Sequence, residues 1–308
     1  MKHVKKIFLL LLAGMAAQGA WAQNHLYAPP LKAYTIESAT AATAATDVRY
    51  QWYRNGEIIP GTAATHDSYE VPETQAVGRN VEFKRAAYVD GCSERKFSNA
   101  IIITFCGLVT PSGLCWADRN VSTPAHFASA ADASADYAWY QWNRPDKAWL
   151  PSDGGNGVAV TGWNATADQA TTWTNGSPCP AGWRLPTMLE YQELDSLSGQ
   201  YTGGPNGTRG GQWVAANSKG NAVAGRFYGP NATTCSLPDN MVGCVFFPAS
   251  GYRNTSNGAL TSQGANGYGW SSTQYNGTTG YRLNFNSTAS TPAGNNSKAY
   301  GYPVRCVQ

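Results

Sequence analysis

The sequence lacks the residue patterns that mark most enzymes. It contains no Gly-x-Ser-x-Gly nucleophile elbow, no phosphate-binding P-loop and no dinucleotide fingerprint. It has no CxxC pair, and its four histidines are scattered, so no cysteine- or histidine-based metal site is predicted. The central acidic residues show no paired pattern typical of a glycosidase; they are Asp118, Asp132, Asp136, Asp146, Asp153, Asp168, Glu190, Glu193 and Asp195. We therefore expect a protein that is not an enzyme and needs no cofactor or metal ion.

Acidic residues are absent from the last part of the chain, where none follows Asp239. Calcium sites need hard oxygen ligands that include carboxylates, so calcium-dependent sugar binding by this part is disfavoured. The whole chain has 22 basic and 19 acidic residues, a net charge of +3. Such a small charge cannot steer a protein strongly towards nucleic acid, so no nucleic-acid partner is expected.

Long apolar runs are also missing, except at the N-terminus. Lys2, Lys5 and Lys6 precede "IFLLLLAGMAA", and small residues follow at Ala20 and Ala22. This order predicts a secretory signal peptide over residues 1–22, cleaved after Ala22, because the run is too short for a membrane-spanning helix. The mature chain is therefore expected to be exported, with no direct membrane insertion.

Seven cysteines in an exported chain indicate disulfides. Two pairs each flank a turn-like insert of eight residues, "GLVTPSGL" and "SLPDNMVG". The pairs suggested by this spacing are Cys106 with Cys115 and Cys235 with Cys244, which leaves Cys179 to join Cys306 and Cys92 alone. A bond between Cys92 and Cys106 is a rival connectivity, since spacing alone does not prove pairing.

The first part of the mature chain, residues 23–105, has the pattern of short β-strands. "VRYQWYRNGEIIPG" alternates in character and then turns at Asn55-Gly56, a hairpin signal, and "NVEFKRAAYVDG" alternates again. Several short strands around an early Trp predict an all-β immunoglobulin-like sandwich. "YQWYRNG" followed by "IPG" resembles the Ig-like modules of Bacteroidetes surface proteins, which implies a spacer on a diderm cell surface.

The second part, residues 106–308, begins where "CGLVTPSGLC" brings Gly, Pro and Ser together. "WRLPTMLEYQELDSLSG" predicts a helix with a Thr187-x-x-Glu190 capping box, an apolar face of Tyr191 and Leu194, and a stop at Gly199. Short strands follow this helix, so an α+β domain is predicted. The many tryptophans of this part are expected mostly in its core.

Six ordered blocks make this second part resemble the Fibrobacter succinogenes major paralogous domain. They are "GLCWADRNVSTP", "YAWYQWNR", "CPAGWRLPTMLEYQEL", "FPASGYR", "GWSST" and "GYPVRCV". The resemblance implies a fold similar to the C-type-lectin-like and formylglycine-generating-enzyme group. In that fold the last strand closes beside the start of the domain, which agrees with a bond between Cys179 and Cys306.

The segment from residue 252 to residue 303 is similar to the variable region of proteins diversified by retroelements. In such regions adenine randomisation turns Asn codons into codons for residues such as Tyr, Ser, Thr and Gly around a constant scaffold. The scaffold here would be residues 270–273, Leu283, Phe285 and residues 304–307. The resemblance implies a polar surface whose sequence differs between copies of the protein.

Alternation along "GYRLNFN" places Leu283 and Phe285 on one side and Arg282 and Asn284 on the other. The apolar pair would anchor the strand, so a Tyr- and Asn-rich face would remain for contact, the composition of antibody binding loops. The expected ligand-binding residues are Tyr268, Tyr275, Asn276, Thr278, Thr279, Tyr281, Arg282, Asn284, Asn286, Asn295, Asn296, Ser297 and Tyr300.

These features favour an exported adhesin or diversified recognition protein that binds a protein or glycan on another cell, phage or host surface without calcium. Two alternatives stand beside it. One is an oxidase similar to formylglycine-generating enzymes, which would need Cys235 and Cys244 as free, copper-binding thiols. The other is a structural surface component with no ligand. The residues predict neither the ligand nor the oligomeric state.

Overall fold

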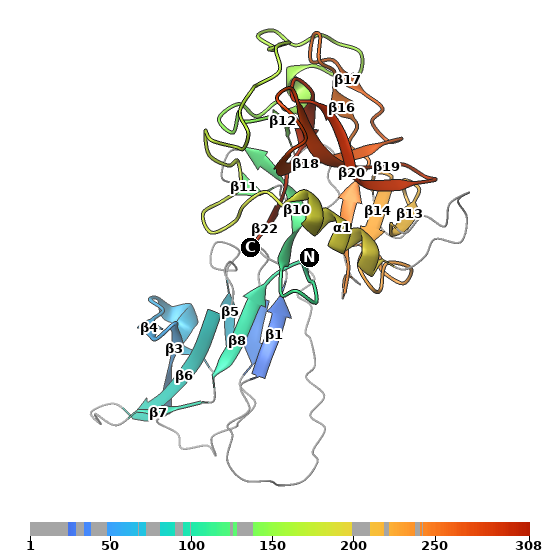
Figure 1. The fold of residues 1–308 in the computed structure, drawn as a ribbon. Coiled ribbons are helices and arrows are strands. Elements are labelled where there is room, and N and C mark those ends of the chain that lie inside the picture. The colour runs from blue at the N-terminus through green and yellow to red at the C-terminus, as the bar shows by residue number, and fades with distance from the viewer. Residues whose placement is uncertain are drawn as a thin grey trace. The chain divides into compact units, whose positions relative to one another are not determined.

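The chain divides into two compact units, Met1–Phe105 and Cys106–Gln308, and each is described by itself. The computed structural model (Figure 1) describes residues 24–28, 34–37, 48–66, 68–71, 81–89, 95–98, 100–123, 126–127, 138–198, 210–218, 222–237, 241 and 243–308. The signal peptide predicted for residues 1–22 lies outside these residues, as do Cys92 and Gly199. None of the described helices is long and apolar enough to cross a membrane.

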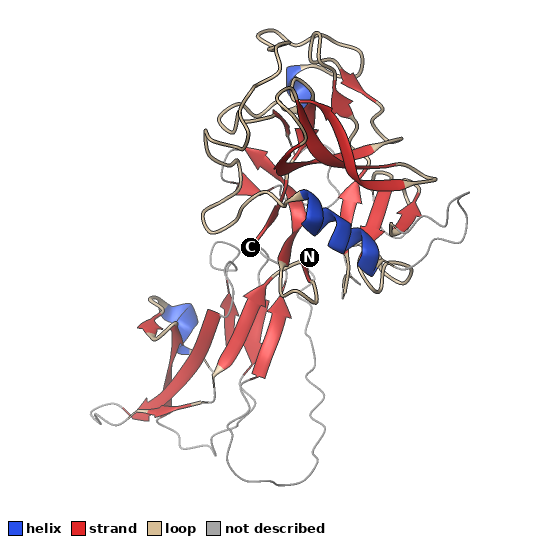
Figure 2. Cartoon of the chain, in the orientation of Figure 1, coloured by secondary structure: helices blue, strands red, loops and turns tan. Residues whose placement is uncertain are grey.

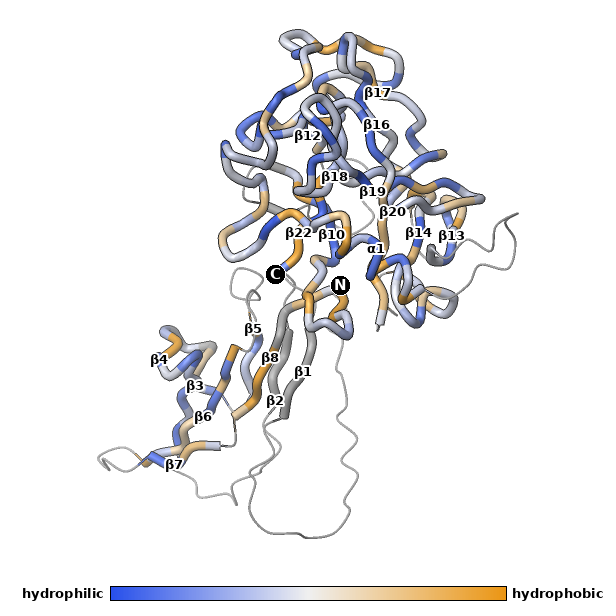
Figure 3. Tube along the Cα trace, viewed as in Figure 1, coloured by the Kyte–Doolittle hydropathy of each residue, from blue (hydrophilic) through white to orange (hydrophobic). Residues whose placement is uncertain are grey.

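The first unit consists of short strands and one 3-10 turn. Its elements are β1 (Asn24–Ala28), β2 (Tyr34–Glu37), β3 (Val48–Arg54), β4 (Glu57–Ile58), η1 (Thr62–Thr65), β5 (Ser68–Val71), β6 (Val81–Val89), β7 (Lys96–Phe97) and β8 (Ile101–Phe105). Six strands form one sheet in the order β1-β8-β6-β3-β4, with β7 beside β6, and β2 pairs with β5 separately. β1 runs parallel to β8, whose hydrophobic run is drawn orange in Figure 3.

The predicted hairpin at Asn55-Gly56 is confirmed, since it joins β3 to β4. Both turn residues have positive φ, 49° and 83°, the combination that Asn-Gly pairs adopt in two-residue hairpin turns. Trp52 is completely buried in the core of this unit, and its indole Nε1 donates to the carbonyl of His66 at 3.0 Å. The early Trp is therefore a core residue, with its polar atom satisfied by backbone.

The second unit holds the single α-helix of the described residues and many short strands. Its elements are β9 (Leu108–Val109), β10 (Cys115–Thr123), β11 (His126–Phe127), β12 (Trp139–Gln141), η3 (Pro151–Asp153), α1 (Met188–Leu197), β13 (Gln212–Val214), β14 (Gly225–Tyr228), β15 (Val245–Pro248), β16 (Tyr252–Arg253), β17 (Leu260–Thr261), β18 (Gly267–Gln274), β19 (Thr279–Phe285), β20 (Ser290–Ser297), β21 (Gly301–Pro303) and β22 (Arg305–Val307). The strands form four small sheets: β11-β10-β22 with β9 beside β10, β12-β21-β16-β17, β13-β14-β15 and β18-β19-β20.

Helix α1 begins where the capping box predicts. The Thr187 hydroxyl accepts from the amide of Glu190, and the Glu190 carboxylate accepts from the amide of Thr187 at 2.7 Å. Tyr191 and Leu194 are completely buried, and the helix ends at Leu197 with Ser198 as its cap. The helix contacts all three strands of the β18-β19-β20 sheet, so its apolar face supports that sheet.

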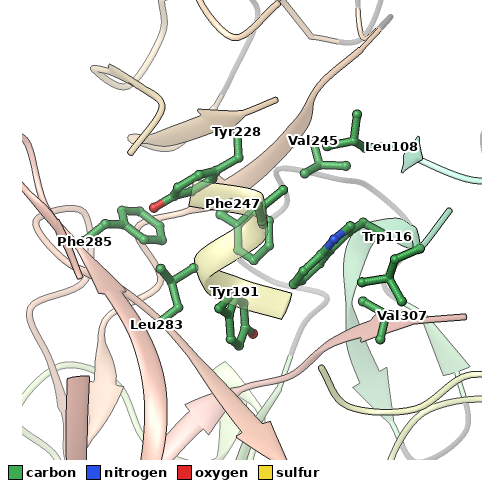
Figure 4. Packing of buried hydrophobic residues seen from close by; sticks show 11 residues of the cluster. Leu108, Trp116, Tyr191, Tyr228, Val245, Phe247, Leu283, Phe285 and Val307 are labelled. Carbon is green, nitrogen blue, oxygen red and sulfur yellow. The ribbon is translucent and has the colours of Figure 1, made fainter. Parts of the chain in front are cut away.

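The main core of the second unit lies between α1 and these sheets (Figure 4). Phe285 packs edge-on against Tyr228 and Phe247, with ring centroids 5.8 and 6.5 Å apart. Trp116 lies 5.2 Å from the Tyr191 ring in the same cluster. The segments that meet here are distant in sequence, so this core exists only once the whole unit has folded.

Three disulfides lie in the second unit and confirm the pairing suggested by spacing: Cys106–Cys115, Cys179–Cys306 and Cys235–Cys244. The rival pair of Cys92 with Cys106 is therefore not formed. Cys179–Cys306 spans 127 residues and joins the segment before α1 to β22. Three disulfides indicate an oxidising compartment outside the cytoplasm.

The predicted fold class, an α+β C-type-lectin-like domain preceded by an all-β immunoglobulin-like sandwich, is wrong. The protein is mainly β, with one α-helix of ten residues and several small sheets, most of them antiparallel (Figure 2). In the described first unit a two-stranded sheet stands beside a six-stranded sheet that includes a parallel pair. Alternating patterns reveal strands and turns but not which strands pair, so the sequence left the sheet arrangement undetermined.

Candidate binding surface

The expected ligand-binding residues centre on the β18-β19-β20 sheet, which has two unlike sides. Along β19, successive side chains point to opposite sides of the sheet. Tyr281, Leu283 and Phe285 therefore share one side, and Arg282 and Asn284 share the other. The predicted alternation agrees with burial, because Leu283 and Phe285 are buried while Arg282 and Asn284 are partly exposed.

The first side packs so closely that glycines are needed on β18. A Cβ at Gly267 would lie 1.9 Å from the ring of Phe285, and one at Gly269 would lie 2.5 Å from the Tyr191 hydroxyl. Both glycines pair directly with the apolar residues, Gly267 with Phe285 and Gly269 with Leu283. This side of the sheet is thus part of the core.

The second side carries a group that we call the tyrosine–arginine cluster: Tyr252, Tyr268, Arg282, Tyr300 and Tyr302. The rings of Tyr268 and Tyr302 stack with centroids 4.8 Å apart and planes 7° apart. Tyr300 stacks on Tyr302 at 5.6 Å and 9°, and Tyr252 meets Tyr268 edge-on at 5.2 Å. Tyr302 is completely buried, whereas the other four members are partly exposed.

Arg282 lies over two of these rings. Its Cζ is 5.2 Å from the ring centroid of Tyr268 and 5.9 Å from that of Tyr302, distances typical of cation–π contacts. Gly294, opposite Arg282 on β20, makes room for the guanidinium, because a Cβ there would lie 2.8 Å from Nη1. Nε and Nη1 are covered and form no hydrogen bond with the described residues.

Burial raises the pKa of both Tyr268 and Tyr302, and the positive charge of Arg282 opposes this shift without cancelling it. A phenol is protonated at neutral pH even without this shift, so both hydroxyl groups are hydrogen-bond donors. The Tyr302 oxygen also accepts from Nδ2 of Asn296 at 2.7 Å. Because Tyr302 is buried, the cluster presents its donor and its positive charge through the partly exposed Tyr268 and Arg282.

A second aromatic pair, Tyr275 with Tyr281, lies towards the end of β19 opposite to Phe285. Tyr275 and Tyr281 meet edge-on at 5.4 Å, and the Tyr275 side chain is 53% exposed. Exposed Asn295 on β20 pairs with Tyr281 across the strands. Because Tyr281 lies on the Leu283 side of β19, this pair and Arg282 occupy opposite sides of the sheet.

Three of the expected ligand-binding residues hold turns. Asn276 Oδ1 accepts from the amides of Thr278 and Thr279, at 3.0 and 2.9 Å, between β18 and β19. Asn286 Oδ1 accepts two amides at 2.9 Å between β19 and β20, and Ser297 Oγ accepts from the amide of Ala299. Such bonds fix local backbone geometry, so these side chains set the shape of the surface.

The remaining expected residues are divided between the turn and the sheet. Thr278 is exposed in the β18–β19 turn, while the hydroxyl of Thr279 is covered and has no hydrogen-bond partner among the described residues. Asn284 lies beside Tyr268 across the strands, and Asn296 lies beside Tyr302. The structure thus brings Tyr268, Arg282, Asn284, Asn296 and Tyr300 together.

Sequence reasoning missed Tyr252 and Tyr302, two members of the cluster. They lie in the blocks "FPASGYR" and "GYPVRCV", at the two ends of the segment 252–303 that resembles a variable region, but they were not among the expected ligand-binding residues. β16 and β21 belong to a different sheet from β18, so only tertiary folding places their tyrosines beside Tyr268. The spacing of these residues along the chain carries no signal that could have found them.

Lys298 was also missed, and it organises the end of the surface. It is 1% exposed, and its Nζ donates to the carbonyl oxygens of Ala170 and Gly277 at 2.6 and 3.0 Å. Burial lowers the pKa of this amine. Lys298 therefore ties the loop around residue 170 to the β18–β19 turn.

No group of three His, Cys, Asp or Glu side chains in the described chain is placed to hold a metal ion.

These observations define a disulfide-linked, mainly β domain that presents a partly exposed aromatic and polar surface beside one sheet. The chain belongs to the Fibrobacter succinogenes major domain family, whose model matches residues 45–308. Comparisons with curated proteins and with solved structures gave no match.

Proposed function

We propose that the second unit is a non-catalytic, calcium-independent ligand-binding module of an exported protein, whose binding surface is formed by the β18-β19-β20 sheet and its turns. The observation that carries this proposal is the division within β19. Leu283 and Phe285 anchor the strand in the core, while Arg282 and Asn284 stay partly exposed beside Tyr268. A surface attached to a packed core is held in shape before a ligand arrives.

The composition of the surface supports contact rather than chemistry. Tyr offers a large contact area at a low entropy cost, while Asn, Ser and Thr supply adaptable hydrogen bonds. The Cys179–Cys306 bond and the core under α1 carry the stability of the unit, so exposed positions such as Tyr275 and Asn295 can change cheaply. The partner would be a protein or glycan on another cell, a phage or a host surface.

We further propose that this surface is diversified by a retroelement. Trp270, Leu283 and Phe285, which the resemblance assigns to the constant scaffold, are buried, while Thr278 and Asn295, within the variable region, are exposed. The neighbouring DNA tests this proposal. A near-copy of the segment for residues 269–307, differing at adenines and lying beside a reverse-transcriptase gene, is expected; its absence refutes diversification but not binding.

The oxidase alternative receives no support from the cysteines it would need. Cys235 and Cys244 are joined to each other, and both are completely buried. A structural disulfide in an oxidising compartment is the ordinary role of such a pair.

Binding is tested with the purified mature chain on panels of glycans and of surface proteins from other cells. Two variants are compared with the wild type: Asn284→Ala with Tyr300→Ala on the proposed surface, and the control Gln192→Ala on the exposed side of α1. We expect at least a roughly tenfold loss of affinity for the first variant and no change for the control. Equal binding by all three proteins would place the ligand elsewhere.

A further inference from the structure

Arg282 differs in its hydrogen bonding from the other basic residues among the last 66 residues of the chain. Residues 243–308 contain four basic residues and no Asp or Glu. Arg253, Lys298 and Arg305 each donate to at least two backbone carbonyl oxygens, as in the 2.9 Å bond from Arg253 Nη1 to Gly258. These three cations are hydrogen-bonded by the fold, although Nε of Arg253 has no partner among the described residues, whereas Arg282 forms no hydrogen bond with them at all.

The guanidinium of Arg282 forms no hydrogen bond and no ion pair with the described residues, although Nε and Nη1 are covered. Its contacts are the faces of Tyr268 and Tyr302. The third guanidinium nitrogen, Nη2, is not covered in this way and remains accessible to solvent. A charge removed from water without a partner raises the free energy of the unliganded protein, and an anion that reaches Nη2 would offset this cost.

From this geometry we propose that the tyrosine–arginine cluster is a subsite for a carboxylate, in which Arg282 pairs with an Asp or Glu side chain of a protein partner. The proposal rests on the binding function proposed above and names the chemistry of its ligand. A guanidinium and a carboxylate form a charge-assisted hydrogen bond, and the hydroxyl group of Tyr268, whose ring lies under Arg282, is a second donor.

The stacking within the cluster favours a peptide over a sugar. Tyr302 stacks against both Tyr268 and Tyr300, at interplanar angles of 7° and 9°, and it is completely buried. A sugar ring that stacks on an aromatic residue needs an accessible ring face, and the buried Tyr302 offers none. The cluster instead offers the guanidinium tip and phenol hydroxyl groups, which match the carboxylate and amide groups of an acidic peptide segment.

Nuclear magnetic resonance of the labelled mature chain tests the subsite directly. The probes are sodium acetate and the blocked amino acids N-acetyl-glutamate methylamide and N-acetyl-glutamine methylamide, each compared with sodium chloride at equal ionic strength. We expect a saturable shift of the Arg282 Nε resonance with acetate and the glutamate probe, but not with the glutamine probe or chloride. Arg184 is an internal control, because Glu190 already pairs with it at 2.8 Å. An Arg282 signal that does not move, or that moves equally with chloride, overturns the subsite.

Selection of displayed random peptides on the immobilised chain tests the partner class. Peptides that bind are expected to share an Asp or Glu, and Arg282→Gln is expected to weaken them about 10- to 100-fold, with Arg282→Lys in between. A different outcome overturns the subsite but leaves the binding function standing. In that outcome the selected peptides share no acidic residue, bind Arg282→Gln as tightly as the wild type, and bind Tyr275→Ala more weakly. Peptides unaffected by every variant of the β18-β19-β20 sheet refute the binding function itself.

Discussion

On one side of the β18-β19-β20 sheet, Leu283 and Phe285 are buried against α1 and the aromatic core, and glycines stand where a methyl group would not fit. On the other side, Tyr268 and Arg282 are partly exposed, although aromatic rings surround them. The first side is filled by apolar contacts. The second leaves a cation without a partner among the described residues.

This difference shows how one strand can serve stability and recognition together. Because alternate residues of β19 face opposite sides, a change at an even-numbered position need not disturb its odd-numbered neighbours. The Leu283 side is packed at Leu283 and Phe285, whereas the Arg282 side combines the buried Trp270 and Tyr302 with partly exposed residues that can carry binding. Four predictions test this division, from the largest expected effect to the smallest.

Removing the Phe285 ring should destabilise the second unit most. Phe285→Ala deletes contacts with Tyr228 and Phe247 and leaves a cavity, with an expected loss of about 3–5 kcal/mol in the free energy of unfolding. Tyr281→Ala is the matched control on the same side of β19, but beyond the buried core, and should cost less than about 1 kcal/mol. Urea unfolding measures both, and equal losses would show that the core does not end at Leu283.

Alkaline pH should destabilise both sides of the sheet through buried phenols. Burial raises the pKa of Tyr191, Tyr228 and Tyr302 above the ordinary 10.0. Above pH 10 the unfolded chain releases phenol protons that the folded chain keeps, so stability falls with pH, by up to about 1.4 kcal/mol per tyrosine and pH unit. Burial lowers the pKa of Arg305 to about 9. Between that pH and 12.5 the unfolded chain binds more protons at this group than the folded chain, so this arginine makes stability rise with pH. The buried phenols outnumber this arginine, so the expected net effect is a fall in stability as the pH rises above 10.

Urea unfolding at a series of pH values measures this loss. Tyr302 is on the cluster side of the sheet but is completely buried. Tyr302→Phe should therefore make the fall of stability above pH 10 less steep by the contribution of one tyrosine, up to about 1.4 kcal/mol per pH unit. Tyr275→Phe, at an exposed position, is the control and should leave the slope unchanged. A slope that Tyr302→Phe does not alter would mean that the cluster opens before its phenol ionises.

A methyl group added on each side of the sheet should have unequal effects. Gly267→Ala puts a Cβ 1.9 Å from the Phe285 ring, which the core holds in place, and should cost about 1–3 kcal/mol of stability. Gly294→Ala approaches Nη1 of Arg282 at 2.8 Å, the end of a flexible side chain that can move aside, so less than about 1 kcal/mol is expected. Thermal unfolding compares the two variants, and a larger cost at Gly294 would show that the cluster side is as rigid as the core.

Replacing Arg282 should have the smallest effect on stability. Arg282→Gln removes a charge that forms no hydrogen bond with the described residues, so a change within about 1 kcal/mol of the wild type is expected. Arg305→Gln is the contrasting arginine, because Arg305 is buried and donates to Asn120 Oδ1 and to the carbonyl oxygens of Ala117 and Phe246. Its loss should cost about 3 kcal/mol or more. Comparable losses for the two variants would show that Arg282 stabilises the fold.

Local features of this protein could be predicted from sequence wherever neighbouring residues decide them. The capping box of Thr187 and Glu190, the Asn55-Gly56 turn and the burial of Leu283 and Phe285 each depend on residues a few positions apart. The two short disulfide loops are of the same kind. The fold class was wrong because it depends on strand pairing, which alternation does not encode.

The sequence alone determined which residues of β19 anchor the strand and which remain for contact, since a period of two follows from backbone geometry. Tertiary structure decided which of the contact residues meet. It placed Tyr252 and Tyr302 beside Tyr268, used Asn276 and Asn286 to hold turns, and left Arg282 over two rings without a hydrogen bond among the described residues. These outcomes depend on contacts between strands of different sheets, and the free energy of such contacts is a property of the folded chain.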